Sequence, residues 1–334
     1  MSDPMPLVEV TRGPFVESFH SGHAVICDDS GQIVRAWGDA DLVMLPRSSC
    51  KMIQALPLVE SGAASAAGLG TRQLALACAS HNGAAIHTGP VTDWLTTLGL
   101  ADSDLRCGPQ EPDDRHERDR LIRAGETPCQ VHNNCSGKHA GFLTLNQHLG
   151  GACDYHDPDH PVQLSCRQAF EETTGEVSAG YGIDGCSAPN FATSLTGLAR
   201  AMAIFASAGD RSGVRDQAAA QLVAAMTAHP ELIAGEGKAC TNLMRATSGR
   251  VAVKTGAEGV YIAIVPERRM GVAIKISDGA TRAAECAIAA ILAGLGVLDP
   301  GHPAAKALLE QPLVNRRGIT AGHVRPAEAL NTGW

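Results

Sequence analysis

Two serine–lysine pairs in the sequence have the residue types and the spacing that nucleophilic catalysis requires. Ser48 and Lys51 form an S-x-x-K pattern where an apolar helix is predicted to begin, and this spacing brings both side chains onto one helix face. Ser80 starts an S-H-N block after a second predicted helix, and Lys254 starts a K-T-G block at the end of a predicted strand. Each pattern alone is common in helix caps and on protein surfaces, so the prediction depends on their joint occurrence.

The order of the three blocks matches a known catalytic signature. S-x-x-K, S-D-N and K-T-G are typical of penicillin-binding serine acyltransferases and class A β-lactamases. Here the middle block is S-H-N, and it lies closer to the first block than expected. A serine hydroxyl needs a base, and a lysine amine can be that base when it is neutral, which a second nearby cation favours. The amide N–H of Ser48 would help to hold the oxyanion. We therefore predict acyl transfer through an ester on serine, without an organic cofactor.

A second group of residues has the chemistry of metal ligands. The block "HNNCSGKHAG" contains Cys135 and Lys138, and the block "GIDGCSAPNFA" contains Cys186. Two thiolates from separate loops could hold Zn²⁺, which prefers sulfur and nitrogen ligands. However, the C-x₂-C pair of common structural zinc sites is missing, and cysteine is also frequent as a small buried residue. From the spacing alone, both the metal site and ordinary buried thiols stay open as interpretations.

The composition is typical of an ordinary globular protein. The chain has 334 residues, of which 44% are hydrophobic and 19% charged, and its formal net charge is −8. This charge and the lack of a Lys/Arg-rich run argue against nucleic-acid binding. The sequence shows no secretory signal and no apolar stretch long enough to span a bilayer, so we expect a cytoplasmic protein without membrane contact. Eleven irregularly spaced cysteines then indicate mostly reduced thiols.

The hydrophobic periodicity predicts strands at both ends of the chain and helices between them. Residues 23–39 have the pattern of a hairpin, and residues 250–277 contain three β-rich runs that precede an Ala-rich helix. The segment 107–130 is polar at its start and then briefly helical, and it is a candidate lid or substrate-approach loop. The tail beyond Leu308 has little pattern. We expect an α/β (α+β) fold, in which one antiparallel sheet from the N-terminal hairpin and the late strands is flanked by helices and a helical subdomain is inserted.

We expect residues 1–334 to form a single catalytic unit. Residues from about 1–45 and 250–300 would supply the sheet and the C-terminal helix. Residues 46–249 would form the mainly helical part, which carries Ser48, Ser80 and the cysteine cluster. We expect the active site in the groove between these parts, since pockets are common at such junctions.

Five blocks of the sequence resemble the signature blocks of the rhizobial-type L-asparaginases, the bacterial asparaginase II family. They are "LPRSSCKMIQALPLVESGAA", "ASHNG", "HNNCSGKHAGFL", "GIDGCSAPNFA" and "VAVKTGAEGVY". The blocks occur in the order of the family, and the resemblance covers nearly the whole chain except the tail after Leu308. The resemblance implies a fold similar to that of the serine β-lactamases and serine-dependent glutaminases. It also implies a small-molecule substrate, L-asparagine, which is hydrolysed to L-aspartate and ammonia.

The resemblance also implies roles for individual residues. Ser48 would be the nucleophile with Lys51 as its paired base, and Ser80 with Lys254 would form a second tandem. One Zn²⁺ per chain would orient the substrate or support the structure, but would not generate the nucleophile. The zinc ligands implied by the family are Cys135, Lys138 and Cys186, and the candidates for gripping the substrate's α-carboxylate and α-amino groups are Arg47, His139 and Asp184.

Two further expectations come with the family. Cys240 matches a family cysteine near the site, although no firm role follows for it. The family also suggests a homodimer.

Two other functions compete with the asparaginase interpretation. One is a different enzyme on the same scaffold, either a serine glutaminase or a penicillin-binding or β-lactamase-like acyl hydrolase. The other is a non-catalytic zinc-binding scaffold in which the serine–lysine pairs are only packing contacts. Turnover of a chromogenic cephalosporin would favour the β-lactamase-like enzyme, and ammonia release from asparagine that depends on Ser48 would exclude the scaffold.

Overall fold

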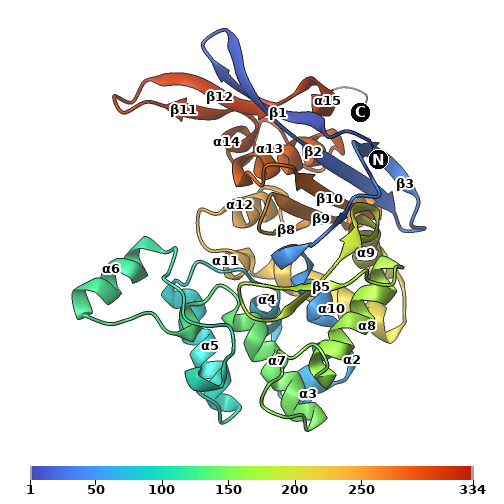
Figure 1. Ribbon diagram of the computed structural model, residues 1–334, viewed down its shortest axis with the longest axis vertical. Coiled ribbons are helices and arrows are strands. Elements are labelled where there is room, and N and C mark those ends of the chain that lie inside the picture. Colours follow the sequence, from blue (N-terminus) through green and yellow to red (C-terminus); the bar gives the residue numbers. More distant parts are fainter. Residues whose placement is uncertain (1, 332–334) are drawn as a thin grey trace. The chain divides into compact units, whose positions relative to one another are not determined.

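The computed structural model describes residues 2–331, which form two compact units (Figure 1). The sheet unit consists of the described parts of residues 1–49, 193–207 and 242–334. The helical unit consists of Cys50–Ala192 and Ala208–Thr241. Both units therefore combine segments that are far apart in the sequence.

The sheet unit is built around one eight-stranded antiparallel sheet. Its strand order is β11-β12-β1-β2-β10-β9-β8, and β3 also pairs with β2. The long strand β2 connects the two sides, because its first half pairs with β1 and its second half pairs with β10 and β3. The bounds are β1 Met5–Arg12, β2 Phe15–Asp28, β3 Ile33–Trp37, β8 Ala252–Thr255, β9 Val260–Val265, β10 Met270–Ile276, β11 Gln311–Val314 and β12 Thr320–Pro326.

Helices cover both faces of the middle of this sheet. The helices α9 (Leu195–Ser207) and α13 (Thr281–Gly294) each contact β9 and β10. Every residue of β9 is buried, and alternate residues of a strand point to opposite faces, so neither face of β9 is open to solvent. This explains why the late strands are continuous apolar runs in the sequence.

Shorter elements complete the sheet unit. The strands β4 and β7 form a separate antiparallel pair, and a 3₁₀ turn, η1, follows β4. The bounds are β4 Val43–Met44, η1 Arg47–Cys50, β7 Thr193–Ser194, α12 Ala239–Ala246, η5 Pro266–Arg268, α14 Pro303–Leu309 and α15 Glu328–Asn331, of which η1 and α12 extend across a unit boundary.

The helical unit is organised around α7 (Ser136–Leu149). Residues 136–146 of this helix are all buried, and α7 contacts α2, α3, α4, α5 and α8. Gly137 allows the closest approach, because a Cβ there would lie 2.4 Å from the carbonyl oxygen of Leu76 on α4. The other bounds are α1 Lys51–Gln54, α2 Leu56–Glu60, α3 Ala63–Ala66, α4 Thr71–Ala77, α5 Ala85–Thr97, η2 Asp102–Asp104, α6 Arg115–Ala124, η3 Gln130–His132, α8 Pro161–Thr174, β5 Tyr181–Ile183, β6 Pro189–Phe191, η4 Ala208–Asp210, α10 Val214–Ala228 and α11 Pro230–Ile233.

The predicted fold class is confirmed, and the tail, for which the sequence predicts no element, joins the sheet. The N-terminal hairpin and the three late strands share one antiparallel sheet, with the Ala-rich helix α13 packed on it. However, the tail beyond Leu308 contributes β11 and β12, and β12 pairs with β1. These strands are mostly exposed, so their sequence lacks the apolar alternation that marks a half-buried strand. Helix α9, expected in the helical part, also belongs to the sheet unit.

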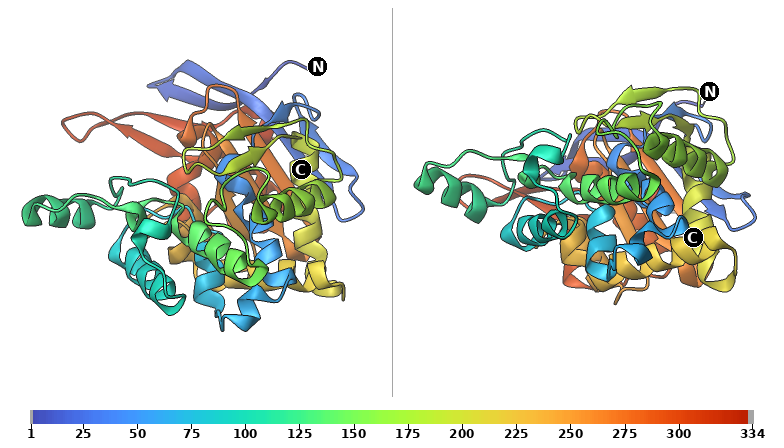
Figure 2. Two further views of the ribbon diagram at one scale, coloured as in Figure 1. Left: turned by 60° about the horizontal axis from the view of Figure 1, so that its bottom comes forward. Right: turned by 90° about the horizontal axis from the view of Figure 1, so that it is seen from below.

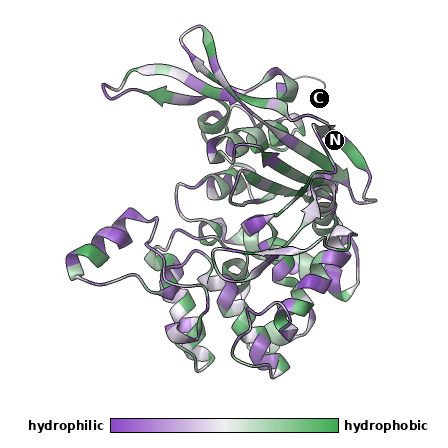
Figure 3. Ribbon diagram, in the orientation of Figure 1, coloured by the Kyte–Doolittle hydropathy of each residue, from purple (hydrophilic) through white to green (hydrophobic). Residues whose placement is uncertain are grey.

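The hydropathy of the elements follows their burial (Figure 3). Strand β9 is hydrophobic along nearly its whole length, whereas α6 is mostly hydrophilic and only Glu117 and Leu121 of it are buried. Within residues 2–331, no helix combines the length and the apolar character that crossing a membrane requires.

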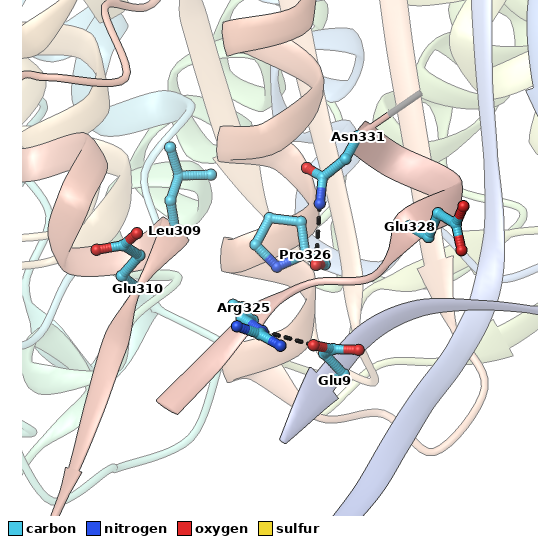
Figure 4. Close-up of a pocket in the computed structure, with 7 residues that line it drawn as sticks. All are labelled: Glu9, Leu309, Glu310, Arg325, Pro326, Glu328 and Asn331. Carbon is cyan, nitrogen blue, oxygen red and sulfur yellow. Dashed lines mark hydrogen bonds and ion pairs between the residues drawn. The ribbon is translucent and has the colours of Figure 1, made fainter. Parts of the chain in front are cut away.

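The sheet unit also carries a surface pocket near its C-terminal strands (Figure 4). Arg325 forms an ion pair with Glu9 across β12 and β1, and Asn331 Nδ2 donates a hydrogen bond to the carbonyl oxygen of Pro326. None of the predicted site residues lines this pocket. The lining residues are Glu9, Leu309, Glu310, Arg325, Pro326, Glu328 and Asn331.

Gly271 on β10 provides a direct test of the packing between the sheet and α9. A Cβ at this position would lie 2.1 Å from the carbonyl oxygen of Ala199 and 2.2 Å from the amide nitrogen of Ala203, both backbone atoms of α9. We expect Gly271→Ala to lower the free energy of unfolding by about 1–3 kcal/mol, because the added methyl group overpacks the contact and displaces α9. Gly209→Ala, at an open and exposed position of η4, is the control and should leave stability equal or slightly higher. Equal urea midpoints for Gly271→Ala and the native chain would contradict this packing.

Candidate active site

Lys51 is the centre of a buried set of polar contacts in the helical unit. Its Nζ donates to the carbonyl oxygen of Ala79 at 2.5 Å, lies 2.9 Å from Ser80 Oγ, and lies 3.5 Å from the carbonyl oxygen of Asn134. Only 1% of Lys51 is exposed. Three separate segments meet here: α1 carries Lys51, the turn after α4 carries Ser80, and the chain before α7 carries Asn134.

The turn that carries Ser80 is held by backbone hydrogen bonds. The amide of Ser80 donates to the carbonyl oxygen of Ile233 at 2.8 Å, and the amide of His81 donates to that of Asn134 at 3.2 Å. The half-buried Ser80 side chain is thereby fixed at the end of a buried helix. This backbone anchoring explains how a short polar block can place one hydroxyl against Lys51.

Ser48 lies in η1, which packs against the K-T-G block of the sheet unit. A Cβ on Gly256 would lie 2.6 Å from the carbonyl oxygen of Pro46 and 3.2 Å from the amide nitrogen of Ser49, so only glycine permits this approach. Ser48 is half-buried, whereas Ser49 is fully buried and its Oγ donates to the carbonyl oxygen of Pro46 at 2.7 Å. Of the two serines, Ser48 is therefore the one with solvent access.

Lys254 lies two residues before Gly256, at the end of β8. Its side chain is fully buried, and its Nζ donates to the carbonyl oxygen of Thr255 at 2.9 Å. The chain passes from η1 into α1 without an intervening residue, so Ser48 and Lys51 of the S-x-x-K pattern lie in consecutive helical turns.

Strained backbone conformations occur beside several predicted site residues. Arg47, directly before Ser48, has φ 54°; Glu258, in the β8–β9 turn, has φ 60°; and Ser187, directly after Cys186, has φ 69°. Non-glycine residues rarely adopt these values, and such strain is concentrated at functional sites. Arg47 Nη1 lies 4.0 Å from Glu258 Oε1, and Lys275 Nζ donates to the carbonyl oxygen of Glu258.

The predicted zinc ligands form one buried cluster in the helical unit. Lys138 Nζ donates to Cys186 Sγ at 3.0 Å, and Cys135, Lys138 and Cys186 are each about 3% exposed. A hydrogen bond between the two thiols, followed by the positive charge of Lys138, lowers the pKa of Cys186 despite its burial. The same hydrogen bond and burial raise the pKa of Cys135. Burial alone would lower the pKa of Lys138, but the charges of the cysteines outweigh it and raise that pKa.

His139 is more deeply buried than a substrate contact would suggest. It is 0% exposed, and its Nδ1 lies 2.8 Å from the Tyr155 hydroxyl. Its Nε2 is buried without a hydrogen-bond partner among the described residues. Burial lowers the pKa of His139 to about 4, although the Cys186 thiolate opposes this shift.

The donor chemistry of the cluster fits Zn²⁺. Two sulfurs and one nitrogen meet in a buried place, and these are the ligand types that zinc prefers. Within residues 2–331, no group of three or more His, Cys, Asp or Glu side chains has a metal-binding arrangement; this cluster has only two such residues, with Lys138 as the third donor. A lysine ligand must bind as the neutral amine, so zinc would displace a proton from Lys138.

Asp184 and Cys240 lie at different depths. Asp184 starts the turn between β5 and β6, where its backbone bonds to Ser187 and Ala188, and its half-buried carboxylate helps to raise the pKa of Lys138. Cys240 is 2% exposed on α12. The structure thus places Asp184 beside the cysteine–lysine cluster in the helical unit.

Two contributors had no clear signal in the sequence. Tyr155 is fully buried against His139 although it belongs to a segment with the composition of a solvated turn. The carbonyl oxygens of Ala79 and Asn134 act through the backbone, so their side-chain types carry no information about the contact with Lys51. Only the quoted blocks "ASHNG" and "HNNCSGKHAGFL" mark the regions of Ala79 and Asn134 as functional.

Comparison with known proteins identifies the family. The model of the L-asparaginase II family matches residues 8–326, nearly the whole chain, so the chain belongs to this family. No curated protein sequence matches the chain.

Several solved structures are similar at low sequence identity. A structure of Mglu in its native form has 13% identity and a TM-score of 0.47, and the match covers 84% of this chain and 66% of that chain. A second native structure of Mglu, in 4.3 M NaCl, has 14% identity and a TM-score of 0.45, with 84% and 62% covered. The chain thus spans slightly less than two thirds of the length of these structures. A β-lactamase from Mycobacterium bovis has 12% identity and a TM-score of 0.38, with 82% and 94% covered.

Two histidines beside Ser80 have structural contacts. His81 stacks on His87 with ring centroids 4.8 Å apart, and His81 Nε2 lies 2.9 Å from Ser136 Oγ. His87 is 0% exposed, its Nε2 lies 2.9 Å from the carbonyl oxygen of Glu231, and its Nδ1 has no hydrogen-bond partner among the described residues. Burial lowers the pKa of His87 from its ordinary value of 6.5.

This lowered pKa predicts a pH dependence of stability. Below pH 6.5 the unfolded chain takes up a proton at His87 that the folded chain binds only at lower pH, so the free energy of unfolding decreases as the pH falls, by up to about 1.4 kcal/mol per pH unit. We expect urea unfolding at pH 7.5 and pH 5.5 to show a larger loss for the native chain than for His87→Gln. His148→Gln, which changes an exposed histidine of α7, should behave as the native chain does. Equal losses for the native chain and His87→Gln would contradict the prediction.

Proposed function

We propose that the protein is an L-asparaginase, which hydrolyses L-asparagine to L-aspartate and ammonia through an acyl-enzyme on serine. The observation that supports this proposal most is the 2.9 Å contact of the buried Lys51 Nζ with Ser80 Oγ, in a chain that matches the L-asparaginase II family over residues 8–326. Catalysis by a serine and a lysine needs a base near a hydroxyl, away from bulk water.

The contacts of Lys51 suit an amine that exchanges protons with a hydroxyl. A neutral amine has two N–H donors and one lone pair. The surroundings of Lys51 Nζ offer two carbonyl oxygens, of Ala79 and Asn134, and one hydroxyl, of Ser80. The carbonyl oxygens can accept the two N–H bonds, and the lone pair can then receive a hydroxyl proton. The same arrangement can return that proton to a leaving group.

In the proposed reaction, Ser48 Oγ attacks the side-chain carboxamide carbon of asparagine while Lys51 accepts the hydroxyl proton. The tetrahedral intermediate collapses when the C–N bond breaks, and ammonia leaves with a proton passed through Ser80. Water then hydrolyses the aspartyl ester by the reverse proton path and releases aspartate. Lys254 would form the second tandem with Ser80, and the amide N–H of Ser48 would help to hold the oxyanion.

Substrate recognition is proposed to involve Arg47, Asp184 and His139. A guanidinium can bind the α-carboxylate in a bidentate manner, and a carboxylate can bind the α-ammonium group. Arg47 and Asp184 are both half-buried, as residues that meet a small substrate need to be. His139 is completely buried and contacts Tyr155. Its proposed part in recognition is therefore indirect, and it holds the cysteine–lysine cluster.

Replacement of Ser48 tests the nucleophile. We expect Ser48→Ala to abolish ammonia release from asparagine, with a loss of at least about 10³-fold, while the circular dichroism spectrum and the urea midpoint are retained. Ser49→Ala, next to it but fully buried, is the matched control and should keep measurable activity.

Mass spectrometry of quenched turnover locates the adduct. An aspartyl ester on the peptide that contains Ser48 is the expected result. Because Lys51 contacts Ser80, an adduct only on the Ser80 peptide would exchange the roles of the two serines. No adduct on either peptide, together with full activity of Ser48→Ala, would refute the serine mechanism.

We also propose that Cys135, Lys138 and Cys186 bind one Zn²⁺. When bound, the ion would act as a Lewis acid that orients a polar substrate group. The three residues would hold it in the buried cluster, and Asp184 and His139 would surround it. The hydroxyl of serine, not a metal-bound water, stays the proposed nucleophile.

Metal content tests this second proposal. After exposure to zinc and dialysis, the native chain should retain about one Zn²⁺ per chain, and Cys135→Ser and Cys186→Ser should lose it. Cys153→Ser, at an exposed cysteine, is the control and should retain it. Retention by the native chain should decrease as the pH falls, because the Lys138 amine must be deprotonated to bind. A native chain without zinc, or equal retention by all variants, would exclude the site.

A further inference from the structure

The helical unit contains a second group of residues that includes a nucleophile, apart from the serines and lysines discussed above. Cys129 precedes η3, and His132 is the last residue of η3. Cys129 Sγ lies 3.2 Å from His132 Nδ1, and His132 Nε2 lies 3.5 Å from Oε1 of Glu117 on α6. A thiol, an imidazole and a carboxylate thus follow one another in a line of contacts.

The hydrogen bonds define the tautomer of His132. The backbone amide of Cys129 donates to His132 Nδ1 at 3.1 Å, so this nitrogen carries a lone pair and the ring proton lies on Nε2. The lone pair of Nδ1 faces both the amide and the thiol of Cys129, which share it, and the N–H of Nε2 faces the carboxylate. This is the polarity that a thiol–imidazole–carboxylate relay requires, because the carboxylate stabilises the imidazolium formed on proton transfer.

A reactive centre needs an accessible nucleophile supported by buried groups, and the exposure of the three residues follows this order. Glu117 and His132 are 8% and 7% exposed, whereas Cys129 is half-buried and reaches the surface. Of the eleven cysteines, nine are buried, and Cys129 and Cys153 have solvent access. Helix α6, which carries Glu117, extends away from the rest of the helical unit in all three views (Figures 1 and 2), so bulk solvent reaches this segment.

Neighbouring charged groups shift the pKa values of Glu117 and Cys129 in opposite directions. Arg120 bonds to Glu117 through Nε and Nη2, and this contact lowers the pKa of Glu117, which keeps the carboxylate ionised. Burial, the negative charge of Asp102 and a hydrogen bond of the thiol with the Asp102 carboxylate raise the pKa of the Cys129 thiol, so Asp102 competes with His132 for the S–H proton. The thiol is therefore protonated near neutral pH, and its reaction requires a base.

We propose that Cys129 is a modification site for α,β-unsaturated carbonyl compounds, with His132 as the base and Glu117 as a positioning residue. The S–H proton moves to His132 Nδ1, which then no longer accepts the hydrogen bond of the Cys129 amide, and the sulfur attacks the β-carbon of the electrophile. An S–C bond forms while the C=C π pair moves to the carbonyl group as an enolate, and the imidazolium returns the proton to the α-carbon. No leaving group or external oxidant is needed.

The test is the labelling rate of the native chain with acrylamide at pH 7, measured by peptide mass spectrometry. Cys153 in the same molecule is the internal reference for an exposed thiol. His132→Gln removes the base but retains a side-chain acceptor for the Cys129 amide, as in a helix capping box. We expect the ratio of Cys129 to Cys153 labelling to fall at least tenfold in His132→Gln. His116→Gln, at an exposed histidine of α6, should leave the ratio unchanged.

Two further measurements separate the relay from a capping role. At alkaline pH, where hydroxide removes the thiol proton, His132→Gln should regain its labelling, which shows that the thiol is still accessible. Glu117→Gln should lower the ratio at pH 7, whereas Glu126→Gln, which also removes a carboxylate from Arg120, should not. The proposal would be overturned if Cys129 of the native chain were not labelled. It would also be overturned if the ratio of Cys129 to Cys153 labelling were equal in the native chain and in His132→Gln.

Discussion

The burial of the Lys51 amine against Ser80, Ala79 and Asn134 is the constraint on which the rest of the helical unit depends. A buried amine must have polar partners, because an unpaired polar group costs several kcal/mol away from water. The fold meets this need with two backbone carbonyls and one hydroxyl, which come from the end of α4 and the start of α7. The same contact that satisfies the lysine also fixes the serine, so stability and the proposed chemistry share one interaction.

In the cysteine–lysine cluster, a buried amine is stabilised by an opposite charge. Lys138 is about as deeply buried as Lys51, but its 3.0 Å partner is a thiol whose pKa is lowered. Removal of one partner from a buried ion pair is strongly destabilising, by about 3–5 kcal/mol, because the other charge stays buried. Lys138 lies in the buried part of α7 and Cys186 lies in the turn between β5 and β6, so packing on both sides makes their geometry rigid. Such rigidity is what a metal site and an oriented substrate both require.

The sequence allowed much of the site to be anticipated because each candidate block joins a chemical residue to a local turn signal. Cys135, Lys138 and Cys186 lie together, as the quoted blocks implied, whereas the contact of Lys51 with Ser80 joins members of the two different predicted pairs. The depth of His139 and the carbonyl partners of Lys51 were not predictable, since burial and backbone contacts depend on packing between distant segments. The line from Cys129 through His132 to Glu117 was missed for the same reason. Its members lie on a turn and on a helix whose charged sequence resembles a solvated face.

The sequence by itself determined the fold class, the order of the catalytic blocks and the family, because periodicity and motif order are properties of neighbouring residues. The tertiary structure decided which residues are buried, which backbone atoms meet the side chains, and that the tail joins the sheet as β11 and β12. These outcomes depend on contacts between residues far apart in the chain, such as Val10 with Val324, and no local pattern encodes such a pairing.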